Sequence, residues 1–268
     1  MTASAEPVRA HRRARTGAIV QAALPFVLLL LLWQGLVAGL QVSPLVFPSL
    51  SAVVRAAGQG LRDGSLFLHL GASLARVAIG TAIALLLAVP LGMAMGVSRA
   101  VAAFFTPLLR FFSVLAGIAW IPIATLWFGY GFGAIVFVIF NAVFFVVAYN
   151  TLLGVATIPV ELRRAAASLG ARRWSMVREV LLPGALPNIV TGIRTGLGFA
   201  WRALIAAEMI ATSTGLGYML FLARDFYRTE VIVLGMVLVG CTWLALDRLL
   251  LAPLERRTIE RWGVVRGA

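Results

Sequence analysis

Lysine is absent from the 268 residues, and all 23 basic residues are arginine. A phosphate-binding loop of the form G-x-x-x-x-G-K-[ST] needs a lysine, so the chain contains none, and any ATP that the protein uses must be bound by another chain. The single cysteine, Cys241, excludes an internal disulfide. The two histidines, His11 and His69, stand far apart in the sequence and predict no metal site.

Charged residues are also scarce. They make up 12% of the chain, whereas 61% is hydrophobic and the mean hydropathy is +0.98. Soluble domains carry about a quarter charged residues, so this composition excludes an ordinary soluble enzyme and predicts an integral membrane protein. A net charge of +13 would suggest nucleic-acid binding in a soluble protein. In a membrane protein, arginines mark the cytoplasmic side and meet anionic lipid, so we expect a lipid bilayer and no nucleic acid as partner.

Six apolar runs are long enough to cross a bilayer as helices of about 20 residues. They cover Ala18–Leu40, His69–Val97, Phe104–Gly129, Gly133–Thr157, Pro187–Ala211 and Val231–Leu251. The first run follows a basic head and could instead be a cleavable signal, but its length and the later spans favour a transmembrane helix. The sequence thus predicts an all-α integral membrane protein with six transmembrane helices. Residues 1–17 would be a basic tail and residues 18–268 one membrane domain.

The distribution of arginine predicts the orientation in the membrane. With the N-terminus in the cytoplasm, the segments on the cytoplasmic side hold sixteen arginines and the outer segments hold four. Both termini are therefore expected to be cytoplasmic.

One cytoplasmic segment, residues 158–183, differs from the other connections. Pro159 can begin a helix, Gly170 can break it, and Pro183 is expected to end a second short helix that carries Trp174 on one face. We call this predicted helix–glycine–helix segment the elbow. It is either an amphipathic helix on the membrane surface or a docking site for a soluble partner, because arginines beside an exposed aromatic are typical of interface anchors.

The elbow resembles the coupling loop, or EAA motif, of membrane subunits of bacterial binding-protein-dependent ABC importers. That motif reads Glu-Ala-Ala, three residues, Gly, nine residues, Ile, one residue, Leu-Pro. The matching positions here are Arg164, Ala165, Ala166, Gly170, Val180, Leu182 and Pro183. Arg164 stands where the motif has glutamate. Any ion pair that the glutamate makes in the family is therefore in question here, whereas the expected shape of the loop is unaffected. The resemblance implies an ATPase-coupling loop that also includes Glu161 and Trp174.

Further stretches resemble the branch of that family that imports nitrate, taurine, alkanesulfonates and pyrimidine precursors. They are His69 to Gly80, Trp127 to Gly131, Ala207 to Met209, and Gly215-Leu216-Gly217-Tyr218. The last stretch is a tight turn, or an outer loop that contacts the binding protein or gates the pathway. The segment Phe112 to Trp120 departs from the proline-rich stretch that the branch has at this position. Because the third helix lines the pathway in such permeases, the departure puts the identity of the cargo in question more than the fold.

The resemblance implies a type I ABC importer-like transmembrane domain with a conserved-core-like region of about residues 66–251. It implies a bacterial inner-membrane location, a second copy of the chain or a close relative, two ABC ATPase subunits and a periplasmic or lipid-anchored substrate-binding protein. The chain itself would bind no cofactor, because ATP would be bound by the partner subunits. ATP binding there would pull the elbows together and switch the paired bundles between inward-facing and outward-facing states.

Four charged residues lie within or near the ends of spans, where charge is costly and marks a functional site by default. They are Arg76, Arg194, Arg202 and Glu208. On the fifth span, Arg194, Trp201 and Glu208 share a face and predict a polar stripe toward the pathway. The alternative is a pair between helices or a snorkelling arginine, which we favour for Arg76 and Glu208. For Arg202, at a position where the family does not predict arginine, both interpretations stay open.

Asn141, Trp120 and two glycine pairs within the spans can be explained by helix packing, and for Asn141 and Trp120 a position in the cargo pathway is also possible. Asn141 either faces the pathway or bonds within the bundle, and Trp120 either faces the pathway or packs at an interface. The pairs Gly92/Gly96 and Gly192/Gly196 predict close helix crossings without naming the partner helix.

The cargo is expected to be a small anion such as a sulfonate or nitrate, with a heterocyclic or aromatic compound as the alternative. An ion-coupled secondary transporter is a further alternative, although the halves show no clear internal repeat. The chain is not expected to be an enzyme. The spans lack the Ser/His, paired-carboxylate or metal-ligand sets that catalysis inside a membrane needs.

Overall fold

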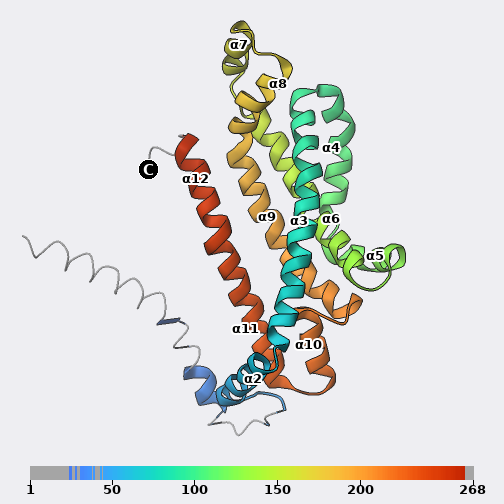
Figure 1. Cartoon of the computed structure of the whole chain (residues 1–268), viewed down its shortest axis with the longest axis vertical. Coiled ribbons are helices and arrows are strands. Elements are labelled where there is room, and N and C mark those ends of the chain that lie inside the picture. The colour runs from blue at the N-terminus through green and yellow to red at the C-terminus, as the bar shows by residue number, and fades with distance from the viewer. Residues whose placement is uncertain are drawn as a thin grey trace, which may run out of the picture.

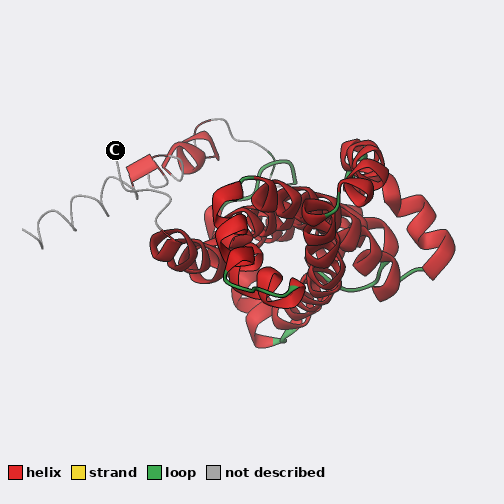
Figure 2. Ribbon diagram, turned by 90° about the horizontal axis from the view of Figure 1, so that it is seen from above, coloured by secondary structure: helices red, strands yellow, loops and turns green. Residues whose placement is uncertain are grey.

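The computed structural model of the chain describes residues 24–25, 28, 31–37, 39, 43 and 45–262. Throughout these residues the chain is helical, with short connections and no β-strand, as Figure 2 shows in a view along the long axis. The all-α prediction is therefore confirmed for the part of the chain that is described. The predicted basic tail 1–17 and most of the predicted first span Ala18–Leu40 lie outside the described residues.

The helices follow one another up and down the long axis of the molecule (Figure 1). In chain order they are α2 (Leu50–Arg62), α3 (Ser65–Val97), α4 (Arg99–Val114), η1 (Gly117–Trp120), α5 (Ile121–Phe128), α6 (Phe132–Ala156), α7 (Val160–Ser168), α8 (Arg173–Ser175), η2 (Met176–Leu181), α9 (Leu182–Ala211), α10 (Leu216–Asp225), α11 (Thr229–Leu246), η3 (Asp247–Leu251) and α12 (Ala252–Trp262). We call the end that carries α7 and α8 the elbow end, and the opposite end the α10 end (Figure 1).

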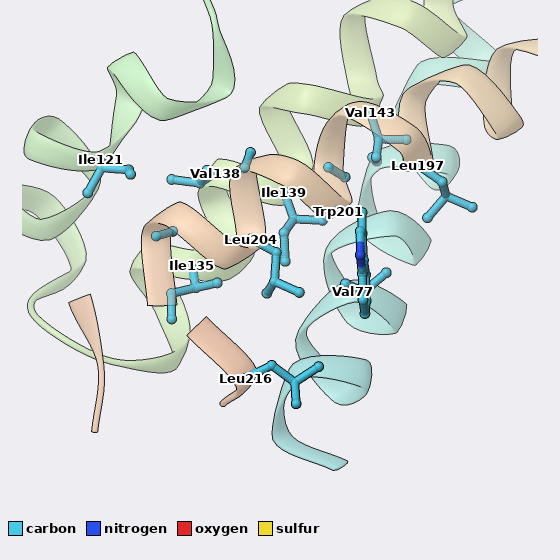
Figure 3. Close-up of a cluster of buried hydrophobic side chains, with 14 of the residues drawn as sticks. Val77, Ile121, Ile135, Val138, Ile139, Val143, Leu197, Trp201, Leu204 and Leu216 are labelled. Atoms are coloured by element: carbon cyan, nitrogen blue, oxygen red, sulfur yellow. The ribbon is translucent and has the colours of Figure 1, made fainter. Parts of the chain in front are cut away.

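Three helices, α3, α6 and α9, form the centre of the bundle. Their contact surface is made of branched aliphatic side chains such as Ile135, Ile139 and Leu204, with Trp201 beside them (Figure 3). The glycine pairs predicted from sequence allow the close approach, because a Cβ on Gly92 would overlap α6 at Thr151, and one on Gly192 would overlap α6 at Asn150. The structure thus identifies α6 as the partner of both pairs.

Within the described residues, length and apolar composition identify three helices that can cross a membrane. They cover Ser65–Val97, Phe132–Ala156 and Thr229–Arg256. Two bent pairs, Arg99–Val114 with Gly117–Phe128 and Met176–Ala211 with Leu216–Asp225, raise the number to five if each pair is one span. The described residues therefore agree with several of the predicted spans, while the count of six and the orientation stay predictions.

The predicted third span, Phe104–Gly129, is not one straight helix. The chain breaks after Val114, and the two halves are bent by 96°. Leu115 and Ala116 adopt extended backbone, and Gly117 then lies so close to α9 that a Cβ there would be 2.8 Å from the Cβ of Ala203. Apolar composition alone cannot reveal such a break, because the sequence from Phe112 to Trp120 contains no charged residue and no proline to mark it.

Candidate functional site

The elbow projects from one end of the bundle (Figure 1), and its tip is exposed while its base is buried. Leu169 and Trp174 at the tip are 89% and 73% exposed. Gly170 sits between the two helices with a φ of +83°, a conformation that favours glycine. At the base, Ile158 and Leu181 are buried in a small apolar cluster shared with α3, α6 and α9. The elbow is therefore a protruding apolar and basic surface anchored to the central helices.

The remaining predicted coupling residues lie on this surface or near its base. Glu161, Arg164 and Ala165 are exposed on α7, and Ala166 is partly buried. In the part of the chain that the structure describes, no acidic side chain lies within 4 Å of the Arg164 guanidinium. Arg164 therefore replaces the acidic charge of the motif with an exposed positive one.

Pro183 does not end the second helix of the elbow, so that prediction is wrong. The helix runs without interruption from Met176 through η2 into α9 and on to Ala211. Pro183 is the second residue of α9, directly after the π-helical turn η2. The preceding π-helical turn, in which the Leu182 N–H reaches the Val177 carbonyl five residues back, accommodates the ring. The elbow is thus joined to α9 as one rod.

A buried ion pair connects α3 to α9 near the α10 end. Arg76 Nη1 lies 2.6 Å from Glu208 Oε1, and the two side chains are 5% and 0% exposed. The Ser73 hydroxyl donates to the same carboxylate at 2.8 and 2.9 Å. This is the helix–helix pair that the sequence analysis favoured for these residues. Glu208 is fully buried in this structure.

The same network fixes the loop between α9 and α10. Arg76 donates to the Thr214 carbonyl at 2.8 Å, and the Gly217 N–H donates to Glu208 at 3.0 Å. Gly215 has a φ of +115°, and a Cβ there would overlap the Glu208 carboxylate. The Gly215 N–H donates to His69 Nδ1, and the ring of Tyr218 lies 6.1 Å from that of His69. The glycines of this loop are thus required by close approach to a buried charge.

Arg194 belongs to a second ionic cluster, at the other end of α9. Its guanidinium donates to both carboxylate oxygens of Asp247, at 2.9 and 3.0 Å, and also to Glu255. These acidic residues lie on η3 and α12, so the cluster ties the C-terminal helix to α9. Trp201, between the two ionic clusters, is buried against Trp243. The structure therefore does not bring Arg194, Trp201 and Glu208 together as one polar stripe.

Two of the predicted pathway residues do share a cavity. Arg202 and Asn141 line a space of about 370 Å³ between α6, α9 and the broken segment after α4. Residues 112–118 form one wall, and Phe145 and Phe199 contribute aromatic rings. Trp120 stands behind this wall, with its ring 5.8 Å from that of Phe112. The segment that departs from the family pattern, Phe112 to Trp120, thus supplies the wall of the cavity opposite Arg202.

Comparison with known proteins decides the family. Residues 80–252 match the family model described as "Binding-protein-dependent transport system inner membrane component". The chain belongs to this family. The taurine transport system permease protein TauC of Escherichia coli is 38% identical, with 90% of this chain and 88% of that protein covered. The putative aliphatic sulfonates transport permease protein SsuC of Bacillus subtilis is 33% identical over 88% and 85% of the two chains.

A bicarbonate permease and a solved methionine transporter are also similar to this chain. The bicarbonate transport system permease protein CmpB of Synechococcus elongatus is 35% identical over 71% of the permease studied here and 69% of the relative. A chain of the inward-facing MetNI methionine ABC transporter has the same fold, with a TM-score of 0.56 at 20% identity, covering 77% of this permease and 98% of that chain. The resemblance derived from the sequence is confirmed. The relatives are named as permeases, which agrees with the expectation that this subunit is not an enzyme.

Several contact residues of the permease were missed by sequence reasoning. Asp247 and Glu255 lie more than fifty residues from Arg194, and nothing in their spacing indicates that they pair with it. A second cavity of about 700 Å³ at the α10 end is lined by Asp63, His69 and Arg228 among others. Hydrogen bonds from the Ser65 side chain and backbone N–H hold the pKa of Asp63 below its usual range. These groups come together only because α2, α3, α10 and α11 converge there.

Proposed function

We propose that this permease subunit forms the cargo pathway of an ATP-driven importer and couples to separate ATPase subunits through the elbow. Two copies of the chain would form the pathway by alternating access in the bacterial inner membrane. A binding protein would deliver cargo at the α10 end. The chain would bind no cofactor, because ATP would be held by the ATPase partners.

The observation that carries this proposal is that the elbow has an exposed tip and a base that is packed against the central helices and continuous with α9. Its tip exposes Leu169 and Trp174, while Ile158 and Leu181 hold its base in an apolar cluster with the central helices. Because η2 continues into α9 without a break, a displacement of the tip moves α9 as a rigid body. A docked partner that pulls the elbow would therefore move the helix that carries Arg202.

The proposed cargo is a small anion. Relatives are named for taurine, bicarbonate and aliphatic sulfonates, each of which carries an anionic group. Arg202 supplies a positive charge in a cavity close to the middle of α9. The family description supports a binding-protein-dependent importer over an ion-coupled secondary transporter.

Native mass spectrometry of the tagged permease, extracted in mild detergent with its ATPase, tests the proposal. We expect two copies of this chain with two ATP-binding subunits. Gly170→Pro removes the φ of +83° that the turn needs, and Trp174→Glu places a charge on the exposed apolar tip, so both should release the ATPase. Phe226→Glu is the matched control, because Phe226 is 68% exposed at the α10 end. An ATPase retained in both elbow variants would contradict the coupling role.

A further inference from the structure

Among the three arginines of the central helices α3, α6 and α9, Arg202 alone has no acidic partner. Arg76 pairs with Glu208, and Arg194 pairs with Asp247 and Glu255. Within the described part of the chain, no carboxylate lies within 4 Å of the Arg202 guanidinium. It lies instead over the ring of Phe199, 5.8 Å from the ring centroid.

The position of Arg202 makes this lone charge costly. It stands nine residues before the end of α9 at Ala211, which is about 14 Å of helix. An arginine at that depth is expensive in hydrocarbon, and such residues face a water-filled cavity or a ligand. The exposed side chain of Arg202 lines the cavity of about 370 Å³. The cavity therefore presents one positive charge that this chain leaves available to a ligand.

The walls of the cavity are mostly apolar. Phe112, Phe145 and Phe199 supply rings, and Leu115 and Ile118 supply aliphatic surface. The contact of Gly117 with Ala203 holds this wall directly beside Arg202, because any larger residue than glycine would push it away. A space of about 370 Å³ lies within the range of roughly 300–1,000 Å³ found for sites of small organic ligands. A bare inorganic anion would leave most of this apolar surface unfilled.

The polar side chains of the cavity can donate hydrogen bonds to an anion, whereas no carboxylate is present to balance a cation. One amide N–H of Asn141 donates to the Phe137 carbonyl at 2.9 Å, and the second amide N–H remains available to a ligand. The Ser113 hydroxyl donates to the Arg110 carbonyl at 3.0 Å, so it is committed. None of the lining residues is acidic. A ligand with a free ammonium group would place that charge near Arg202 with no counterion.

We propose that this cavity is a cargo subsite that selects organic anions with an apolar body and discriminates against both inorganic anions and zwitterions. Arg202 and Asn141 would hold the anionic group, and the wall of residues 112–118 with Phe145 and Phe199 would receive the apolar body. The proposal rests on the proposed importer function. It also separates this permease from TauC, whose name specifies the zwitterion taurine.

Binding of three probes to the full-length permease, purified in an uncharged maltoside detergent, tests the subsite. Isothermal titration would compare benzenesulfonate, taurine and nitrate. We expect benzenesulfonate to bind at least about tenfold more tightly than either of the others. A charge-assisted hydrogen bond contributes about 1.5–3 kcal/mol, so Arg202→Gln should weaken benzenesulfonate about 10- to 100-fold. Arg202→Lys, which keeps the charge, should recover part of the affinity.

Arg224 provides a matched control. Its guanidinium lies over Phe221 at 5.6 Å, the same type of contact, but outside the cavity. Arg224→Gln should bind benzenesulfonate as the unmodified chain does. Equal losses in the two variants, unchanged binding in Arg202→Gln, or equal affinity for nitrate or taurine would overturn the proposal. Displacement of benzenesulfonate by phosphatidylglycerol at lower concentration would also overturn it, because the cavity would then hold a lipid headgroup.

The outcome can be separated from that of the importer proposal, because the titration needs no ATPase. Binding that depends on Arg202 in a chain that recruits no ATPase would refute only the coupling role. An intact complex with ATPase, but without binding that depends on Arg202, would refute only the subsite.

Discussion

At the scale of single residues, the central helices α3, α6 and α9 contain three arginines in three different environments. Arg76 is enclosed with Glu208, Arg194 is half-exposed with two carboxylates, and Arg202 faces a cavity. The enclosed pair is the most sensitive to change, because removal of one partner leaves the other charge buried without compensation. The half-exposed pair is screened by its surroundings and is expected to contribute less.

Arg76→Ala should lower the stability of the permease in detergent by about 3–5 kcal/mol, because the buried Glu208 carboxylate would lose its positive partner and the Thr214 carbonyl would lose the Arg76 donor. Thermal unfolding followed by circular dichroism measures the change. Arg228→Ala is the control, since the Arg228–Glu230 pair is exposed and 3.4 Å long, and we expect less than about 1 kcal/mol from it. The double change Arg76→Met with Glu208→Leu should be less harmful than Arg76→Ala. A Tm for Arg76→Ala equal to that of the control would show that the pair is not structurally important.

At the scale of elements, both π-helical turns precede a proline in the same way. The Leu182 N–H reaches back five residues to Val177 before Pro183, and the Ala252 N–H reaches back five residues to Asp247 before Pro253. A wider turn leaves room for a proline ring that would otherwise meet the carbonyl four residues earlier. The two turns therefore let the elbow and α9, and likewise α11 and α12, continue as single rods.

Arg194 is the connection between these two rods, and it sets how firmly α12 is held. In Arg194→Ala, Asp247 and Glu255 lose their common partner. We expect faster hydrogen–deuterium exchange in α12 while α3 and α6 stay protected, because only the contact between α9 and α12 is lost. Arg248→Ala is the control, because Arg248 is exposed on η3 and, in the described part of the chain, has no carboxylate within 4 Å. Unchanged exchange in α12 would mean that apolar packing alone holds it.

At the scale of the whole molecule, the elbow and the loop between α9 and α10 lie at opposite ends of the long axis (Figure 1). Partners that dock at the two ends would therefore lie on opposite sides of the membrane. The distribution of arginine predicts that the elbow end faces the cytoplasm. The central helices connect both ends, so under the proposed mechanism a motion started at one end would be transmitted to the other.

Cysteine labelling tests this orientation. In a Cys241→Ser background, which removes the single native thiol, Ser168→Cys marks the exposed end of α7, and Asp225→Cys marks the end of α10. A membrane-impermeant maleimide should label Asp225→Cys in intact cells, and label Ser168→Cys only after the membrane is opened. The reverse pattern would place the elbow outside and exclude a cytoplasmic ATPase partner.

The sequence by itself determined the class of the molecule. The scarcity of charge and the long apolar runs require helices in a membrane, because in hydrocarbon the backbone can satisfy its hydrogen bonds only in helices or closed barrels. The spacing of Ala165, Ala166, Gly170, Leu182 and Pro183 was enough to identify the family, since such a motif is local in the chain. The same spacing predicts the coupling loop.

Only the tertiary structure decided which long-range partners each polar group has. Glu208 could have faced a pathway, but α3 brings Arg76 and Ser73 against it across more than 130 residues. Arg202 could have paired within the bundle, but the break after Val114 opens a cavity in front of it. Both outcomes depend on how helices pack around one another, and hydrophobic periodicity does not contain that information.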